Sequence, residues 1–189
     1  TVTVRDRDTM EQITLKVEEL KELLNKRRIR TGNAKDLSWI ADKSVDLVIT
    51  SPPYLCSQDY IKTMRLMNLF FEDKYAFGEG IKQEIGARTS RRGKSDIVVP
   101  RFYADLDVVF DNIDRVLKDN AYFCLVMGQG KSKIISEYNI INDLIELIEC
   151  QHRFQLVFRR ERQIGSRVIQ VGGVDKESIL IFEKKKKEI

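Results

Sequence analysis

The stretch VDLVITSPPY, Val45–Tyr54, decides the fold of this chain. Its first six residues are too few for a stable helix, are rich in β-branched side chains and show no polar alternation. They therefore predict a β-strand that is buried on both faces, as in a parallel sheet flanked by helices. The strand stops at Pro52 and Pro53, whose rings fix φ and remove two N–H donors. The chain must leave the sheet there in a preset direction.

Elements on the C-terminal side of this stretch predict an α/β fold. Apolar residues at helical spacing predict helices over 59–71, 105–118 and 135–148, the last with Ser132 as its N-cap. Short apolar runs predict strands over 121–127, 154–158 and 178–182. Alternating strands and helices are typical of a layered α/β fold. Because no helix is evident between the last two strands, we predict that they form an antiparallel pair at the edge of the sheet.

The N-terminal region predicts a separate helical element. Between Met10 and Arg28, apolar side chains recur at helical spacing, at Met10, Ile13, Val17, Leu20 and Leu24. We therefore predict an amphipathic helix within residues 1–28, followed by a second domain over 29–189 whose first strand lies at Ile29. Because the sequence begins with Thr1 rather than methionine, we expect it to be part of a longer polypeptide or a processed product.

Composition points to a globular protein of the cytoplasm. The chain has 189 residues, of which 42% are hydrophobic and 33% are charged, values typical of one soluble domain. No apolar run approaches the roughly 20 residues that cross a bilayer, and the start is too polar for a signal peptide. The three cysteines are far apart and the chain has a single histidine. This pattern argues against a disulfide framework or a metal site.

Basic side chains gather in two stretches and suit a polyanionic partner. The first, within a predicted loop over 72–101, contains Arg88, Arg91, Arg92 and Lys94. The second contains Arg159, Arg160, Arg162 and Arg167, and we predict that it is also a loop. Clusters of this kind attract phosphate backbones. The alternative is that each is simply part of a solvated surface.

The Ser-Pro-Pro-Tyr corner has the chemistry of a site that binds an amine. In open α/β sheets, ligands bind beyond the carboxyl ends of the strands, which is where Ser51 follows Thr50. An oxygen of Ser51 and the carbonyl of Pro52 could accept both hydrogens of an exocyclic amine. Tyr54 offers an aromatic ring on which the base carrying that amine could stack.

These residues resemble the catalytic motif of the amino-group DNA methyltransferases, which methylate cytosine N4 or adenine N6 with S-adenosyl-L-methionine. In that family the Ser-Pro-Pro-Tyr form is mostly associated with cytosine N4. Two further segments are similar to family patterns: Arg115-Val-Leu-Lys118 before a strand, and the last predicted strand, Glu177–Lys184. Asp119-Asn-Ala121 departs from the Pro-Gly-Gly that usually follows the first of these. The resemblance covers about residues 30–184 and implies that Ser51, Pro52, Pro53 and Tyr54 are catalytic.

The resemblance also implies a Rossmann-like methyltransferase sheet of which this chain supplies the second half. Asn33 and Asp36 are similar to the family's segment near the cofactor adenine, and with Thr50 they are the expected cofactor-binding residues. The family's Phe-x-Gly-x-Gly cofactor loop is not found after a predicted strand. Phe77-Gly-Glu-Gly80 also contains a phenylalanine followed by two glycines, but it is one residue shorter and lies in the predicted basic loop. We expect an N-terminal half or a second subunit to carry that loop, or the cofactor site to be defective.

The expected function is therefore methyl transfer from S-adenosyl-L-methionine to cytosine N4 in double-stranded DNA, with the target base flipped out of the helix. We expect the enzyme to be part of a restriction-modification system, with the predicted loop over 72–101 on the DNA. Two alternatives stay open: an adenine-N6 or RNA base methyltransferase, and a non-catalytic nucleic-acid-binding subunit or half of a split enzyme.

Overall fold

A computed structural model describes residues 2–5, 12–15, 32–57, 84–86, 95–130, 135–164, 174 and 176–186. The chain divides into two compact units, residues 1–33 and residues 34–189. The predicted helix over 59–71, the predicted strand at Ile29 and the basic residues Arg88, Arg91, Arg92 and Lys94 lie outside the described residues. Among the described residues, no helix is long and apolar enough to cross a membrane.

The N-terminal unit contains a β-hairpin where we predicted the start of a helix. β1 (Val2–Arg5) pairs antiparallel with β2 (Gln12–Leu15), with Val2 opposite Leu15 and Arg5 opposite Gln12. The predicted helix over Met10–Arg28 is therefore wrong for Gln12–Leu15. Both strands are rich in β-branched residues, and the charged residues between them suit a connection, so local strand preference outweighs the helical spacing.

A four-stranded mixed sheet forms the centre of the second unit. Its strand order is β3-β4-β6-β5, formed by β3 (Val45–Thr50), β4 (Leu117–Gly128), β6 (Lys176–Lys184) and β5 (Phe154–Gln163). β3 and β4 are parallel, whereas β6 is antiparallel to both β4 and β5. The predicted α/β class and the antiparallel pair of last strands are confirmed, and both strands of that pair are longer than predicted.

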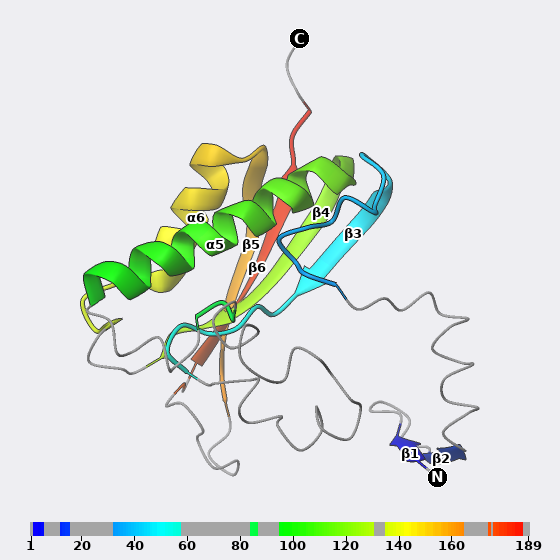
Figure 1. The fold of residues 1–189 in the computed structure, drawn as a ribbon, viewed down its shortest axis with the longest axis horizontal. Coiled ribbons are helices and arrows are strands. Elements are labelled where there is room, and N and C mark those ends of the chain that lie inside the picture. Colours follow the sequence, from blue (N-terminus) through cyan, green and yellow to red (C-terminus); the bar gives the residue numbers. More distant parts are fainter. Residues whose placement is uncertain are drawn as a thin grey trace. The chain divides into compact units, whose positions relative to one another are not determined.

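Two helices cover one face of this sheet (Figure 1). α5 (Ser95–Val116) connects β3 to β4 along the chain, and α6 (Ile140–Gln151) connects β4 to β5. Buried residues of α5 and α6 share one hydrophobic core with alternate residues of β4 and β6. Phe123 on β4 stacks on Phe182 of β6, with ring centroids 5.8 Å apart. A parallel crossover with helices packed on the sheet gives a Rossmann-like arrangement.

Both helices begin at residues that the sequence did not indicate. α5 starts at Ser95, so the predicted loop over 72–101 is wrong for Ser95–Arg101. The reason is burial: Val98, Val99 and Phe102 pack into the core, which outweighs the hydrogen bond lost at Pro100 inside the helix. α6 starts after Asn139, which caps it by accepting a hydrogen bond from the Asn142 N–H, so the predicted cap at Ser132 is also wrong.

The turn predicted at Asp119-Asn120 lies within β4 rather than before it. The pairing of β3 with β4 shifts between Val45, which lies opposite Leu117, and Leu47, which lies opposite Tyr122. The extra residues of β4 form an irregularity, and Asn120 has a φ of 62°. Asparagine tolerates this left-handed conformation better than other residues with a side chain, except glycine.

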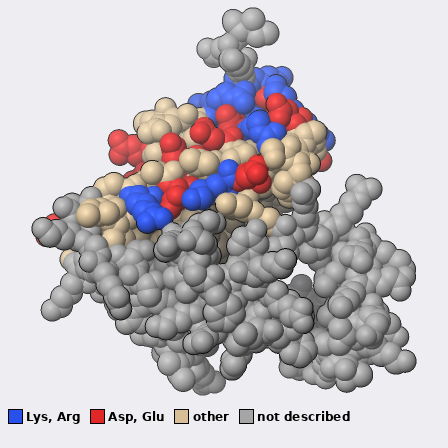
Figure 2. Space-filling view, in the orientation of Figure 1, with Lys and Arg blue, Asp and Glu red and all other residues tan. Residues whose placement is uncertain are grey.

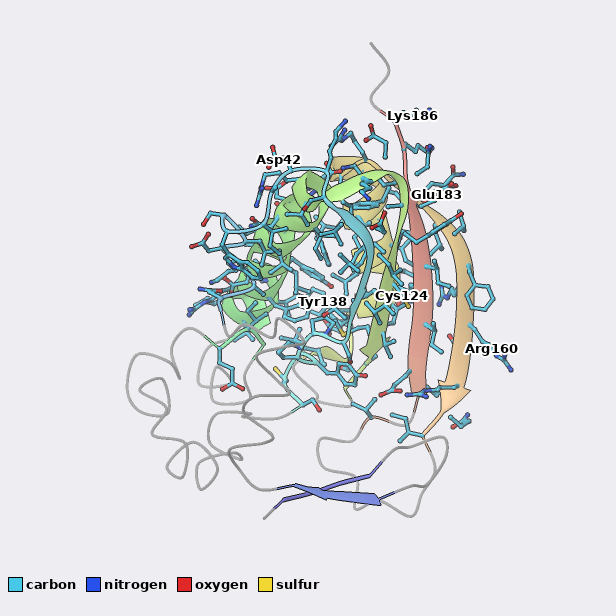
Figure 3. The ribbon with its side chains drawn as sticks, turned by 90° about the vertical axis from the view of Figure 1, so that its right-hand side faces the viewer. Asp42, Cys124, Tyr138, Arg160, Glu183 and Lys186 are labelled. Carbon is cyan, nitrogen blue, oxygen red and sulfur yellow. The ribbon has the colours of Figure 1, made fainter. Side chains whose placement is uncertain are left out.

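The second face of the sheet differs from the prediction that β3 is covered on both sides. Ile49, Cys124, Ile181 and Phe158 lie in one register row across β3, β4, β6 and β5. In β3, the side chains of Leu47 and Ile49 are 51% and 69% exposed. The described helices both lie on the other face (Figure 3), which is why these apolar residues are left uncovered by them.

A buried lysine locks the end of α5 to the end of β6. The side chain of Lys184 is fully buried, and its ammonium group donates hydrogen bonds to the carbonyl oxygens of Asp114 and Leu117, the latter over 2.6 Å. The Asp114 carboxylate lies 3.3 Å from the same nitrogen. The ammonium group therefore lies among two carbonyl acceptors and a carboxylate near the C-terminus of the helix, where positive charge is favourable.

Candidate active site

The candidate site lies at one end of the sheet, where four strands contribute to it. Ser51–Tyr54 follow the carboxyl end of β3, and Gly128 is the last residue of β4. Because β6 runs antiparallel to β4, its first residues lie at this same end, with Glu177 opposite Gly128. Arg162 of β5 lies opposite Glu177 in turn. The register thus brings the predicted corner next to residues from the last third of the chain.

The backbone of the corner is held by a tight turn beneath it. The Ser57 N–H donates to the Tyr54 carbonyl over 3.1 Å, and Cys56, at a φ of 56°, takes the left-handed conformation. The Cys56 N–H donates to the Gly86 carbonyl over 2.9 Å. Leu55, Cys56 and Ser57 are all buried, whereas Ser51 is exposed. The corner therefore presents an exposed hydroxyl on an anchored backbone.

Gly86 lets the neighbouring segment approach this turn. Its φ is +69°, and a Cβ atom there would lie 3.1 Å from the ring of Phe102 on α5. The same Cβ would lie 3.4 Å from the Cα atom of Leu55. Glycine is thus favoured both by its backbone conformation and by the close contact. Cys56 takes part through its backbone and its buried side chain.

The ring of Tyr54 packs directly on the end of β4. A Cβ atom at Gly128 would lie 2.9 Å from Cε2 of Tyr54 and 2.5 Å from Cγ1 of Val174, closer than such atoms come in proteins. Any side chain at position 128 would therefore displace the ring or Val174. Nothing in the local sequence links Gly128 to Tyr54.

The hydroxyl of Tyr54 is bonded to a carboxylate from the last strand. It donates a hydrogen bond to Oε1 of Glu177 over 2.6 Å. Arg162 donates to the other oxygen, Oε2, from Nε over 2.8 Å and from Nη2 over 2.6 Å. The Ser51 hydroxyl lies 3.4 Å from the Tyr54 hydroxyl. Four side chains from three segments thus form one chain of polar contacts that ends at the exposed Ser51.

Glu177 is ionised in this setting. Partial burial opposes its charge, but the hydrogen bonds from Tyr54 and Arg162 and the positive charge of Arg162 outweigh it. The pKa of the Glu177 carboxyl therefore lies below the ordinary glutamate value of 4.5. Sequence reasoning quoted Glu177 only as part of a strand pattern and Arg162 only as part of a basic stretch. No sequence signal paired either one with Tyr54.

The predicted cofactor-binding residues fall into two groups. Thr50 is half-buried at the carboxyl end of β3, next to Ser51 and opposite Leu125 of β4. Asp36 lies in the segment before β3, where its carboxylate accepts a hydrogen bond from the Ser38 N–H over 3.1 Å. This segment is tied to α5, since Lys35 forms a 2.8 Å ion pair with Asp105. Asn33 is the last residue of the N-terminal unit and is exposed.

The second basic stretch is not a loop, as we had predicted. Residues 158–163 belong to β5, so Arg159, Arg160 and Arg162 lie on an edge strand of the described sheet, with Arg160 and Arg162 on the same face. Arg167 lies outside the described residues. On the side of the molecule shown in Figure 2, basic and acidic side chains are interspersed. Lys43 and Asp119 form such a pair over 2.8 Å, and Lys118 and Asp46 another over 2.6 Å.

The described part of the chain contains three cysteines, Cys56, Cys124 and Cys150, and none of them forms a disulfide. Burial raises the pKa of the Cys124 thiol. In the described part of the chain, no cluster of three or more His, Cys, Asp or Glu side chains could hold a metal ion. What the corner offers is an exposed hydroxyl, backbone carbonyls and a fixed aromatic ring.

Comparison with known proteins finds similarity to DNA methyltransferases. No family model matches the sequence. The type II methyltransferase M.MjaI of Methanocaldococcus jannaschii is 24% identical over 132 residues, which are 68% of this chain and 41% of that protein. The chain therefore spans less than half the length of the curated relative that it matches.

Among solved structures, a DNA modification methylase from Thermus thermophilus is similar over 84% of this chain and 53% of its own. The sequence identity is 16% and the TM-score 0.49. The cytosine-N4-specific PvuII DNA methyltransferase overlaps 84% of this chain and 50% of its own, with 18% identity and a TM-score of 0.43. In sequence, this chain is similar to part of a type II methyltransferase.

Proposed function

We propose that this chain is the catalytic part of an S-adenosyl-L-methionine-dependent DNA methyltransferase whose target is the exocyclic amine of a base, cytosine N4. The observation that carries the proposal is the Ser51–Tyr54 corner at the carboxyl end of β3. There an exposed hydroxyl and backbone carbonyls lie beside an aromatic ring that Gly128 and Glu177 hold in place. The similarity to a type II methyltransferase supports the same conclusion.

The residues of the corner would act by binding and orienting the amine. The oxygens of Ser51 and of the Pro52 carbonyl accept its two hydrogens, while Pro53 keeps the backbone rigid between them. These bonds favour a pyramidal nitrogen, whose lone pair is then free to attack. Tyr54 stacks on the flipped base and fixes its plane. Holding the amine against the methyl donor supplies much of the rate acceleration.

When bound, S-adenosyl-L-methionine supplies the electrophilic methyl group on its sulfonium. With Ser51 and the Pro52 carbonyl holding the amine, the methyl group would pass to nitrogen, the electron pair of the carbon–sulfur bond would stay on sulfur, and one amine proton would leave to solvent. No covalent bond to the protein would be needed.

The described residues fit the cofactor in part. Thr50 adjoins the corner and Asp36 offers a carboxylate in the segment before β3, so both suit hydrogen bonds to the cofactor, with Asn33 as a further candidate. A glycine-rich loop after a strand, which would hold the methionine part, is not among the described elements. We therefore propose that another stretch of polypeptide, in the same protein or in a second subunit, completes the cofactor site.

The free edge of β3 supports this part of the proposal. In the described sheet β3 pairs only with β4, and its Leu47 and Ile49 side chains are largely exposed. Unpaired edges with exposed apolar residues are templates for further strands. The rest of the enzyme would pair with β3 and cover the row Ile49, Cys124, Ile181 and Phe158.

DNA is the proposed substrate, with Arg88, Arg91, Arg92 and Lys94 as its phosphate contacts. Neutralising these four side chains would weaken DNA binding and make the affinity depend less steeply on salt concentration, because each contact with a phosphate releases counterions. A place in a restriction-modification system is the corresponding biological proposal. Two alternatives remain, an adenine-N6 or RNA base methyltransferase on the same corner, and a non-catalytic nucleic-acid-binding subunit.

The test is transfer of tritiated methyl from S-adenosyl-L-methionine to DNA, using this chain alone and with the product of a neighbouring reading frame. We expect Tyr54→Ala and Ser51→Ala to abolish transfer, whereas Tyr122→Ala, which removes an exposed ring elsewhere on β4, leaves it intact. Transfer that survives both corner variants would overturn the proposal. Mass analysis of the modified nucleosides separates cytosine N4 from adenine N6, and cofactor binding without transfer would favour the non-catalytic subunit.

A further inference from the structure

We infer that Glu177 and Arg162 are positioning residues, which fix the Ser51 hydroxyl as a hydrogen-bond acceptor toward the target amine. The inference rests on the proposed function and deepens it. Neither residue belongs to the Ser-Pro-Pro-Tyr corner, and both act through Tyr54. What carries the inference is the direction of the hydrogen bonds along Arg162, Glu177, Tyr54 and Ser51.

The first two links of this chain have only one possible direction. A guanidinium group donates and never accepts, and an ionised carboxylate accepts and never donates. Arg162 gives two hydrogen bonds to Oε2 of Glu177, over 2.8 Å and 2.6 Å. Because Oε2 is taken by Arg162, Oε1 faces Tyr54 as a pure acceptor, 2.6 Å from its hydroxyl oxygen. Short bonds of this kind to a charged acceptor are the strong ones.

The third link follows from the single proton of the phenol. Tyr54 has committed that proton to Glu177, so its oxygen can only accept from any further neighbour. The neighbour is the Ser51 hydroxyl, at 3.4 Å, a contact near the upper limit of a hydrogen bond. In this contact Ser51 must therefore be the donor. Hydrogen bonds in unliganded sites are often long and shorten when substrate binds.

These hydrogen-bond directions determine where the lone pairs of Ser51 point. A hydroxyl has one proton and two lone pairs, and when the proton points at Tyr54 the lone pairs face the exposed side of the corner. An exocyclic amine presents hydrogens, so it meets an acceptor rather than a hydroxyl that is free to rotate. Electrostatic preorganisation of this kind needs no reorientation at the moment of reaction.

Loss of the negative charge of Glu177 would remove the constraint on the direction of these hydrogen bonds. In Glu177→Gln the side-chain amide can turn its NH₂ toward Tyr54, which then donates to Ser51 instead. The Ser51 hydroxyl then accepts from Tyr54 and must point its own proton in another direction, which can be toward the amine. Tyr54→Phe breaks the same chain while it keeps the ring that stacks on the base. Both substitutions therefore act on Ser51 in the same way, by releasing the direction of its hydroxyl proton.

The first experiment tests the contact itself and does not require methyl transfer. In a double-mutant cycle of Glu177→Gln and Tyr54→Phe, measured by urea unfolding of the full chain, we expect the pair to be coupled by about tenfold in the unfolding equilibrium constant. A coupling of less than twofold would overturn the inference and would leave the proposed function standing.

The second experiment tests the role of the contact. We expect Glu177→Gln, Arg162→Gln and Tyr54→Phe each to lower kcat about tenfold, with KM for DNA unchanged because the stacking ring remains. The double variant Glu177→Gln/Tyr54→Phe should be no slower than Tyr54→Phe alone, since both changes break one chain. Arg162→Lys, which keeps a donor, should restore part of the rate.

The matched control is Glu183→Gln, which removes a carboxylate from the same strand at its far end (Figure 3) and should leave kcat unchanged. Additive losses in the double variant, or a normal kcat in Glu177→Gln, would overturn the inference. If transfer also survives Tyr54→Ala, the proposed function itself fails, so the two failures are distinguishable.

Discussion

The two ends of β6 each carry a charged side chain with polar partners, but they use it differently. At one end Lys184 is fully buried and gives its hydrogen bonds to the carbonyls of Asp114 and Leu117. At the other end Glu177 accepts from Arg162 and Tyr54, and through Tyr54 the contacts reach the exposed hydroxyl of Ser51. The first network is closed, whereas the second ends on a group that can still bind something.

This difference teaches how to separate structural from functional polar groups in one fold. Lys184 is fully buried with its ammonium group among oxygens of the protein, so no side of it faces solvent. In the arrangement that we infer above, the hydrogen bonds at the other end leave two lone pairs of Ser51 facing outward. Substitutions at the Lys184 end should therefore change stability, and substitutions at the Glu177 end should change activity more than stability.

Lys184→Met should have the largest effect and tests the structural end. It leaves the Asp114 carboxylate, the Asp114 carbonyl of α5 and the Leu117 carbonyl of β4 without their shared partner in a buried place, and removing one partner of a buried pair costs about 3–5 kcal/mol. Urea unfolding gives the value, and Lys186→Met, at an exposed position, should cost almost nothing. Equal losses of unfolding free energy in Lys184→Met and Lys186→Met would contradict a structural role for the buried lysine.

Gly128→Ala should have the next largest effect and falls on the functional end. The new methyl group would meet Val174 and the ring of Tyr54, and overpacking of this kind costs about 1–3 kcal/mol. We expect Val174→Ala in the same chain to restore stability while methyl transfer stays low, because the contact with Tyr54 remains. Recovery of both together would show that the position of the ring is unimportant.

Asn120→Ala should have a smaller effect, again at the structural end. At a φ of 62°, alanine loses about 1 kcal/mol relative to residues that accept the left-handed conformation. Asn120→Gly is the matched substitution and should change the free energy of unfolding by less than about 0.5 kcal/mol. Thermal or urea unfolding distinguishes them, and methyl transfer should be normal in both. A loss of activity in Asn120→Gly would contradict the separation of the two ends.

The smallest expected effect is the pH dependence of the unfolding free energy that Glu177 causes. Because its folded pKa lies below the unfolded value, its contribution to stability is complete above pH 4.5 and is lost as the pH falls through the folded pKa. The difference in unfolding free energy between the wild type and Glu177→Gln should therefore be constant from pH 7 to about 5 and shrink at lower pH. A difference that grows on acidification would contradict an ionised Glu177.

Much of the fold could be predicted because its signals are local. The β-branched run Val45–Thr50 and the apolar face of α5 indicate their elements without reference to the rest of the chain. The lack of a helix between the last two strands correctly indicated an antiparallel pair. The Ser51–Tyr54 corner could be found from its prolines and its position after a strand.

What could not be predicted depends on contacts between distant segments. Tyr54 and Glu177 are 123 residues apart, and they meet only because β6 inserts between β4 and β5 in one register. The same insertion makes Gly128 a contact of the ring rather than a simple turn residue. The start of α5 was missed because burial of Val98 and Val99 overrides a proline that normally ends a helix. Deciding between core burial and the cost of a proline inside a helix requires the packed structure.

The place of β6 in the sheet has a consequence for the protein during its synthesis. A ribosome adds about 5–20 residues per second, so Glu177 follows Tyr54 by an interval on the order of ten seconds. Until then the nascent corner has no carboxylate for its tyrosine, and β5 lacks the one strand with which it pairs in the described sheet. Chains released before β6 is made should therefore lack the hydrogen bond between Tyr54 and Glu177 and be open to proteolysis.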